Sequence, residues 1–362
     1  MNSNSLNALA LQRLKKDFWG VFSFCVILAF GFLGLLAYVI APDNSEHANQ
    51  MHLAVHSKPP GFKVKMLNVP NQFKSNQHNF SKWFLGEKYP DKTVPLRDYE
   101  FTEDSLLYLE YGTPLDTLLY KKMTIEAFND VDRKKLVIDK VFYLGTDKYG
   151  RDMLSRLLVG ARISFSIGFV AVLISLIVGL FMGSVSGYYG GKVDALIMWI
   201  INVTWSIPTL LMVIAITLAL GKGFWQVFIA VGLTMWVEVA RVVRGQVMSV
   251  KEMQYVTAAR ALGFNDLRII VNHILPNIMA PVIVICASNF AAAILIESGL
   301  SFLGIGAQPP VSSWGAMIKN HYNYIILGKP YLAIAPGVCI MLLVMSFMLL
   351  GNALRAALDV RR

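Results

Sequence analysis

Long runs of apolar residues without Asp, Glu, Lys or Arg constrain this chain more than any other feature. A helix needs about 20 mostly apolar residues to cross the hydrocarbon core of a bilayer, which is roughly 30 Å thick. Five runs are long enough, and they cover residues 18–42, 163–191, 195–221, 269–296 and 330–354. A sixth run, 223–237, is short but continues past Glu238. The sequence therefore predicts an all-α membrane protein with six transmembrane helices.

Six spans place both termini on one side of the membrane. Lys and Arg concentrate in short cytoplasmic loops, so their distribution selects that side. The flanks that become cytoplasmic carry Arg13, Lys15, Lys16, Lys192, Arg241, Arg244, Lys251, Arg260, Arg268, Arg355, Arg361 and Arg362. The opposite short flanks carry Lys222, Lys319 and Lys329. We therefore expect residues 1–17 and the C-terminus to be cytoplasmic. Span 18–42 should be a retained anchor, since no small-x-small cleavage site follows it.

The net charge of +10 raises the question of nucleic-acid binding. Residues 42–150 contain fifteen basic and fifteen acidic residues, so the whole excess lies on the membrane-spanning remainder. That distribution is typical of membrane topology and of contact with lipid headgroups. We expect membrane lipid, and no nucleic acid, among the partners.

The segment between the first two spans, residues 43–140, is too charged to enter the bilayer. Residues 106–111 and 135–142 have strand patterns, and 117–128 has a helical one. A small mixed external insert is therefore predicted. Four histidines lie in it, namely His47, His52, His56 and His78. We favour solvated polar residues over zinc or nickel ligands there.

Familiar catalytic and nucleotide-binding patterns do not occur in the sequence. C-x-x-C, H-E-x-x-H, G-x-S-x-G and the P-loop are all absent. We therefore expect no catalytic residue, no bound cofactor and no metal site on this chain.

A polar stretch, 241–277, interrupts the apolar pattern after the fourth span. Small side chains leave its first helix open to close approach by another protein, and these are Ala258, Ala259 and Ala261. Gly263 permits the left-handed turn that ends a helix, and Asn265 suits the N-cap of a second helix. One face of that helix carries Leu267, Ile270, Val271, Ile274 and Leu275 until Pro276 stops it.

This stretch resembles the EAA loop of type I importer permeases of the ATP-binding-cassette (ABC) class. The family pattern is E-A-A, three residues, G, nine residues and I-x-L-P. The matching positions here are Thr257, Ala258, Ala259, Gly263, His273, Leu275 and Pro276, with Thr257 in place of Glu and His273 in place of Ile. The sequences AARALG and HILPN are similar to those of permeases in the dipeptide and oligopeptide branch, where the Glu is often absent. The resemblance implies that these residues couple the chain to an ATPase.

Residues 144–162 read LGTDxxGRDxxSRLxxGAR, which is similar to the dipeptide, oligopeptide and nickel branch. The candidate external gate or interface residues in it are Asp147, Gly150, Arg151, Asp152 and Arg156. From Asp152 onward we expect an amphipathic helix on the outer membrane surface, with Asp152 and Arg156 paired. Lipid phosphates are favoured over substrate as the partners of Arg151 and Arg156.

A third run, 297–306, reads ESGLSFLGIG and resembles the same branch. Two roles stay open for Glu297: it faces a transport cavity, or it bonds to backbone N–H groups at the interface. Glu238 is expected to pair with Arg241 rather than to line a transport path. Pro208 should kink the third span, although broken helices also mark transport pathways.

The resemblance covers residues 141–362 best and implies a permease core with transmembrane helices 2–6. It also implies a second homologous permease, two cytoplasmic ABC ATPase subunits that use ATP and Mg, and an external substrate-binding protein. The substrate class expected is di- and oligopeptides in a bacterial inner membrane, with nickel or another small solute as the alternative. Whether the two permeases are identical stays open.

Two functions of other classes compete with this interpretation. A secondary transporter or channel would need no ATPase, but it gives no reason for the small-residue loop at 257–263. A membrane-anchored binding or assembly protein explains the insert, but not the five further spans.

Overall fold

The structure, a computed structural model, describes residues 6–71, 78–102, 105–113, 120–124, 136–221 and 223–358. Two compact units make up the chain. The first, called the helical unit, comprises Met1–Gly31, Ser164–Gln308 and Gly337–Arg362. The second, called the sheet unit, comprises Phe32–Ile163 and Pro309–Pro336. Three basic residues named above, Lys222, Arg361 and Arg362, lie outside the described residues.

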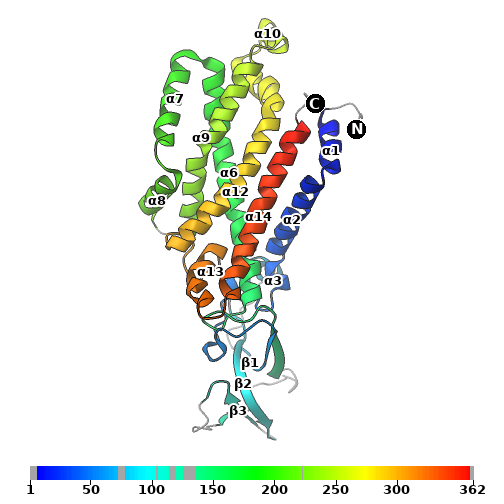
Figure 1. Cartoon of the computed structure of the whole chain (residues 1–362), viewed down its shortest axis with the longest axis vertical. Helices are drawn as coiled ribbons and strands as arrows, with labels where there is room; N and C mark the ends of the chain where they lie inside the picture. The colour runs from blue at the N-terminus through cyan, green and yellow to red at the C-terminus, as the bar shows by residue number, and fades with distance from the viewer. Residues whose placement is uncertain are drawn as a thin grey trace. The chain divides into compact units, whose positions relative to one another are not determined.

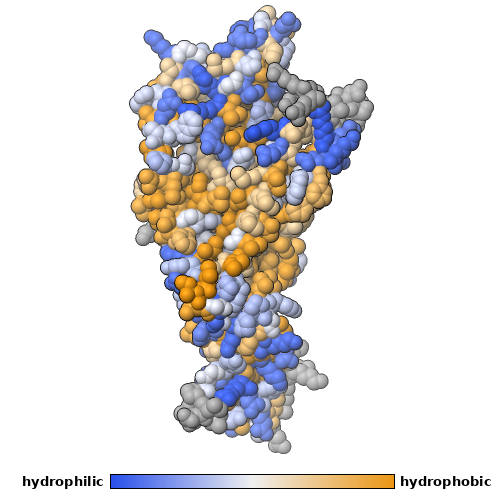
Figure 2. All heavy atoms as spheres, in the orientation of Figure 1, coloured by the Kyte–Doolittle hydropathy of each residue, from blue (hydrophilic) through white to orange (hydrophobic). Residues whose placement is uncertain are grey.

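Within the described residues, five helices are long and apolar enough to cross a membrane (Figure 1). They are α2 (Phe18–Leu35), α6 (Met153–Tyr189), α9 (Phe224–Val250), α12 (Leu275–Leu303) and α14 (Tyr331–Leu358). A short helix, α1 (Leu6–Lys16), precedes them. Figure 2 shows hydrophobic residues gathered over the long helices, as contact with lipid tails requires.

The third expected span is broken in two. Neither α7 (Gly191–Trp205) nor α8 (Thr209–Leu220) is long enough to cross a membrane alone, but the two together are long and apolar enough. They are bent by 92° at the break. Pro208 is the N-cap of α8, and its ring cannot continue the helix that precedes it. Counted as one span, the pair completes the six that the sequence predicts.

Glycines at four-residue spacing bring α6 and α9 close together. A Cβ atom added at Gly179, Gly183 or Gly187 would lie 2.5, 2.7 and 2.9 Å from the Cβ atoms of Val239, Val243 and Val247. All three valines are fully buried. The small residues therefore let these two backbones approach, as in other membrane helix pairs.

Among its described residues, the sheet unit contains five antiparallel strands in the order β4-β3-β2-β1-β5. They are β1 (Phe62–Val69), β2 (Lys92–Phe101), β3 (Ser105–Glu110), β4 (Lys121–Thr124) and β5 (Val137–Phe142). Leu67, Leu96 and Leu106 are at the centre of the sheet's core. The mixed insert and its two strands are confirmed. The helix expected over 117–128 is wrong at 121–124, which form an edge strand; its other residues, except Tyr120, lie outside the described ones.

The described part of the sheet unit also contains short helices: α3 (Ala37–Ile40), η1 (Glu46–Ala48), η2 (Leu53–Val55), α4 (Asn79–Leu85), α13 (Trp314–His321) and η5 (Tyr322–Ile325). One expectation is corrected. No separate amphipathic helix follows Asp152, because α6 runs without a break from Met153 to Tyr189. No Pro occurs between these two residues, so the helix continues directly into the apolar run.

Candidate functional site

The polar stretch 241–277 begins with the last turns of α9 and then folds into two short helices. α10 (Gln254–Ala261) ends at Gly263, whose φ of +81° lies in the left-handed region. The backbone N–H of Gly263 donates to Arg260 at 3.0 Å, and that of Phe264 donates to Ala259 at 3.2 Å. These bonds satisfy carbonyls at the end of α10, as a glycine C-cap does. The predicted left-handed turn is confirmed.

The second helix starts as predicted but ends differently. Asn265 caps α11 (Asp266–Ile269), and its side chain accepts a hydrogen bond from the Arg268 backbone at 2.8 Å. A π-helical turn, η4 (Ile270–Ile274), then leads directly into α12. The expectation that Pro276 stops the helix is wrong. Pro276 lies in the first turn of α12, where its missing N–H is tolerated.

Burial divides the loop into an inner and an outer face. The inner face consists of Val256, Ala259, Ile269, Ile270 and Ile274. These side chains pack in one core with Tyr188 and Val243. Ala259 is only 3% exposed, so its side chain points into the chain's own core. Thr257, Ala258, Leu262 and Leu267 are exposed, the two leucines at 74% and 69%. The predicted apolar face is therefore split, with Leu267 and Val271 outside.

Polar and aromatic contacts hold the loop against the end of α6. The hydroxyl of Tyr188 donates to Asp266 Oδ1 at 2.6 Å and accepts from Arg260 at 3.5 Å. This bond to Tyr188 raises the pKa of Arg260. The His273 ring stacks on Phe264 with centroids 5.7 Å apart. The sequence did not single out Tyr188, because its partner Asp266 is 78 residues away.

A second polar group joins α7 to α9. Arg244 binds Asp194 through two hydrogen bonds of 2.6 Å. Arg241 donates to Asn202 at 2.7 Å, and its guanidinium lies 3.5 Å from the centroid of the Trp205 ring. The expected pair between Glu238 and Arg241 does not form among the described residues, because Arg241 is held by α7 instead.

In the sheet unit, Asp147 is the centre of the LGTDxxGRD motif. Its carboxylate is fully buried and accepts from the backbone N–H of Tyr149 and Arg151 at 2.8 and 3.0 Å. It also accepts from Arg151 Nε at 2.7 Å and lies 3.7 Å from Arg156 Nε. Both arginines are at most 4% exposed, so the expectation that they anchor to lipid phosphates is wrong. They are part of a buried ion cluster.

Gly150 and Asp152 shape the turn around this cluster. Gly150 has a φ of +72°, and a Cβ atom there would lie 1.8 Å from the His52 carbonyl oxygen. Asp152 accepts from the backbone and the hydroxyl of Ser155 at the start of α6, the former at 2.8 Å. The expected pair of Asp152 with Arg156 is therefore wrong: Asp152 acts as a helix cap, and Arg156 faces Asp147.

Residues 312–321, which lie far away in sequence, contact the segment that carries the ion cluster. The Ser312 hydroxyl donates to the Arg156 carbonyl at 3.1 Å, and Trp314 Nε1 donates to the Leu157 carbonyl at 3.0 Å. His321 Nδ1 contacts the Met317 carbonyl at 2.7 Å, while its Nε2 lies 3.5 Å from the Lys148 N–H. These contacts fit a neutral ring, and burial lowers the pKa of His321.

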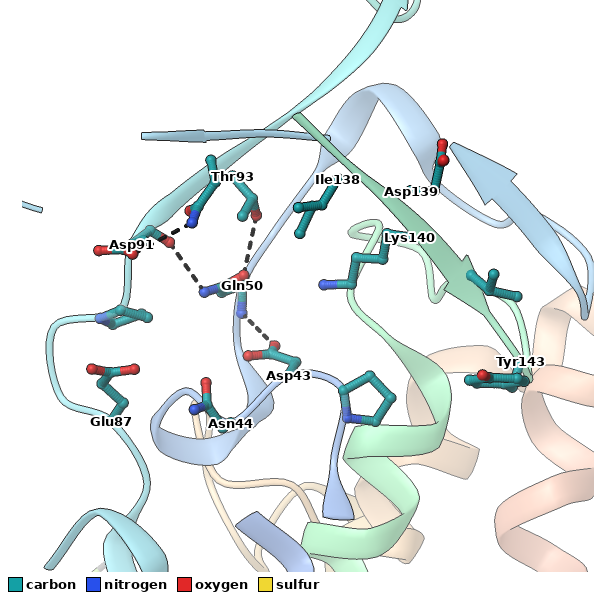
Figure 3. Close-up of a pocket in the computed structure, with 14 residues that line it drawn as sticks. Asp43, Asn44, Gln50, Glu87, Asp91, Thr93, Ile138, Asp139, Lys140 and Tyr143 are labelled. Atoms are coloured by element: carbon teal, nitrogen blue, oxygen red, sulfur yellow. Dashed lines mark hydrogen bonds between the residues drawn. The ribbon is translucent and has the colours of Figure 1, made fainter. Parts of the chain in front are cut away.

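An open polar cavity of about 410 Å³ is lined by residues 42–50 and by residues of strands β1, β2 and β5 (Figure 3). Asp43 lines this cavity, and its backbone N–H donates to Ser155 Oγ at 2.9 Å. The Asp43 carboxylate accepts from the backbone N–H groups of Ser45 and Gln50. Gln50 in turn bonds to Thr93 and Asp91. The acidic lining is thus largely bonded within the chain.

The insert histidines do not gather into a metal site. Among the described residues, no group of three or more His, Cys, Asp or Glu side chains is arranged to hold a metal ion. His52 is not the solvated residue expected: it is 7% exposed, and its Nε2 lies 3.2 Å from the Thr93 hydroxyl. Burial, helped by the charge of Lys140, lowers the pKa of His52 to about 4.

Glu297 is fully buried in the last turns of α12. It accepts a hydrogen bond of 2.6 Å from Ser301 Oγ, which accepts from the Ala307 N–H at 3.1 Å. A Cβ atom on Gly306 would lie 2.2 Å from Ser301 Oγ. Glu297 therefore supports the glycine turn that follows α12.

Comparison with known proteins matches residues 160–361 to the family described as "Binding-protein-dependent transport system inner membrane component". The loop 241–277 and Glu297 lie within the match. The insert and the segment 147–156 lie outside it.

Three curated relatives have similar coverage. The glutathione transport system permease protein GsiD of Pectobacterium atrosepticum is 38% identical over 65% of this chain and 77% of its own length. The Bacillus subtilis dipeptide permease protein DppC is 41% identical over 60% and 68%. The Bacillus subtilis oligopeptide permease protein OppC is 39% identical over 61% and 72%. A solved MetNI methionine ABC transporter chain gives a TM-score of 0.47 at 17% identity, over 57% of this chain and 97% of that one.

Proposed function

We propose a transport function for this chain, which belongs to the family of binding-protein-dependent transport system inner membrane components. It acts as the membrane-spanning permease subunit of an ATP-driven ABC importer. The relatives are permeases named for glutathione, dipeptides and oligopeptides. We assign di- and oligopeptides as substrates, ahead of nickel or another small solute.

The proposed topology places both termini and the loop 241–277 in the cytoplasm, and the insert outside. Residues 1–17 precede the first span at 18–42, residues 43–140 form the external insert, and 141–362 form the permease core. The distribution of Lys and Arg over the short loops supports this orientation.

The exposed face of the loop carries the proposal. Thr257, Ala258, Leu262 and Leu267 form it, and we call it the coupling face. It combines small residues with two exposed leucines, which suits a groove on another protein. The bond from Tyr188 to Asp266 and the shared core tie it to α6 and α9. Motion of a docked ATPase therefore reaches the spans through Gly263, His273, Leu275 and Pro276, with Ala259 as the inner support.

ATP and Mg are used by two partner ATPase subunits, while a second homologous permease completes the path and an external binding protein delivers substrate. Substrate moves by alternating access. On the external side, the ion cluster of Asp147, Arg151 and Arg156, with Gly150 and Asp152, holds the start of α6, and Glu297 holds the turn after α12.

Purification from the native membrane tests the assignment. We expect a homologous permease and ABC ATPases to co-purify, and the reconstituted complex to import a labelled dipeptide only with ATP and binding protein. Import by this chain alone would support a secondary transporter or channel instead. ATP-dependent uptake of nickel without peptide uptake would show that the substrate is nickel and not a peptide.

A further inference from the structure

Glu238 is an exposed carboxylate near the middle of the membrane-spanning helix α9, three residues before the stretch 241–277 that the proposed topology places in the cytoplasm. At 1.5 Å per residue it lies about 21 Å along the helix from Phe224 and about 18 Å from Val250. An ionisable side chain within a membrane-spanning helix is costly against lipid and almost always faces a water-filled cavity or a protein partner. The exposed face around Glu238 therefore belongs to a transport path or to a subunit interface.

A cavity of about 170 Å³ lies beside this carboxylate. Its walls come from the break between α7 and α8, from α9 and from α12, and Glu238 is the only ionisable residue among those that line it. Pockets that enclose a whole drug-sized ligand measure roughly 300–1,000 Å³. This cavity suits one end group of a substrate rather than a complete peptide.

Acceptors and donors both line the cavity: Thr209 and Trp205 carry donor groups, whereas Thr204 and Thr234 face it as acceptors. Thr204 and Thr234 both line it, and each hydroxyl donates its proton to a backbone carbonyl of its own helix at 2.8 Å. A hydroxyl has one proton, so these two have only lone pairs left to offer. Together with the carboxylate they form a set of oxygen acceptors, which is the complement of an ammonium group.

The broken span presents helix ends of both signs to the cavity. α7 ends at Trp205 with partial negative charge, whereas α8 begins at Thr209 with partial positive charge. In other transporters the C-terminal ends of such half-helices hold cations and the N-terminal ends hold anionic groups. The nearby cation of this chain, Arg241, is already bonded to Asn202 and stacked on Trp205.

We propose that the cavity beside Glu238 is a recognition site for a primary ammonium group, such as the amino terminus of a peptide in transit. The proposal rests on the function proposed above and adds the group that is recognised and the residues that recognise it. Glu238 supplies the charge, and Thr204 and Thr234 supply the neutral acceptors.

The test uses the complete transporter in liposomes with its binding protein. Glu238→Gln should lower ATP-dependent dipeptide uptake about tenfold, as loss of one charge-assisted hydrogen bond would. Glu238→Asp, which keeps the charge, should retain most of the uptake. Methylammonium chloride, compared with sodium chloride at equal concentration, should inhibit the wild-type transporter and not Glu238→Gln.

Equal uptake by Glu238→Gln and wild type, or equal inhibition by methylammonium, would overturn this inference and leave the proposed function standing. Absence of wild-type peptide import would overturn both. If Glu238→Gln does not assemble with its partners, Thr234→Val tests the inference instead, because it removes one acceptor at nearly constant volume. This variant should lower dipeptide uptake several-fold. Unchanged uptake would overturn the inference.

Discussion

Arg151 Nε lies 2.7 Å from Asp147 Oδ2, and neither side chain has more than 4% of its surface exposed. Arg156 approaches the same oxygen at 3.7 Å, so one carboxylate faces two buried guanidinium groups. Removing the negative charge therefore leaves two cations without compensation in a place where desolvation is costly.

Asp147→Asn tests this relationship. Breaking a buried pair by removing one partner typically costs about 3–5 kcal/mol, so we expect a large loss of stability. Thermal unfolding of the purified complex in detergent measures it. Glu100→Gln, an exposed carboxylate on β2, is the matched control and should change little. Equal melting of both variants would show that the cluster contributes no net stability.

A pair of glycine variants separates steric clash from backbone strain. Gly150 and Gly61 have nearly the same φ, +72° and +78°, but only at Gly150 would a Cβ atom collide, 1.8 Å from the His52 carbonyl oxygen. Gly61→Ala should cost about 1 kcal/mol through strain alone. Gly150→Ala should cost clearly more, measured as the fraction of protein that is folded in the membrane. Similar losses would show that the turn can shift away from His52.

Acid should destabilise the sheet unit through His52. Its pKa is about 4 in the folded chain, against an ordinary value of 6.5, so the unfolded chain binds more protons between these values. Stability is therefore complete above pH 6.5 and falls as the pH drops towards 4, by an amount on the order of 3 kcal/mol. Melting temperature against pH measures this. His52→Gln should flatten part of the slope, while His47 and His321, whose pKa values burial lowers in the same direction, should keep part of it.

Local rules predicted much of this chain, and distant contacts account for some of the misses. The apolar runs, the interruption of the third span at Pro208 and the cap at Asn265 depend on neighbours in sequence, and all were predicted, although the expected kink at Pro208 is a break of 92°. Arg151 was predicted to anchor to lipid because the sequence shows that it lies next to a span. The sequence does not show its contact with Asn49, which is 102 residues away. The division of the loop into Ala258 outside and Ala259 inside likewise depends on the core around Tyr188.

That division gives a paired prediction for coupling. Ala258→Glu places a charge on the coupling face, so the permease should insert normally but co-purify with less ATPase and lose uptake. Ala259→Glu buries a charge in the permease's own core and should destabilise the chain itself. Ala54→Glu, the same change at an exposed position in the sheet unit, is the control. Normal ATPase recovery and uptake in Ala258→Glu would exclude this face as the coupling element.

Gly263→Val should weaken coupling through backbone conformation. Apart from the two chain neighbours, no atom of the described residues lies within 4 Å of a Cβ atom there, so the cost within the permease comes from the φ of +81°. A β-branched residue is a poor fit in that region, at about 1–2 kcal/mol. Reduced ATP-dependent uptake with normal membrane insertion is the expected result. Gly245→Val, where φ is not positive and space is open, is the matched control for the substitution.

Excising the sheet tests whether the insert belongs to the permease fold. The Gly61 N–H donates to the Phe142 carbonyl at 2.9 Å, so a short Gly-Ser linker from Gly61 to Tyr143 can replace residues 62–142. A deletion of 57–134 would instead remove Ser57 and Lys58, whose N–H groups bond to Asp147 and Thr146 at 2.8 and 2.9 Å. The deletion of 62–142 keeps that support for the ion cluster. We expect membrane insertion and ATPase co-purification to persist, while capture of substrate or binding protein changes. Loss of insertion would mean that the sheet is required for the core to fold.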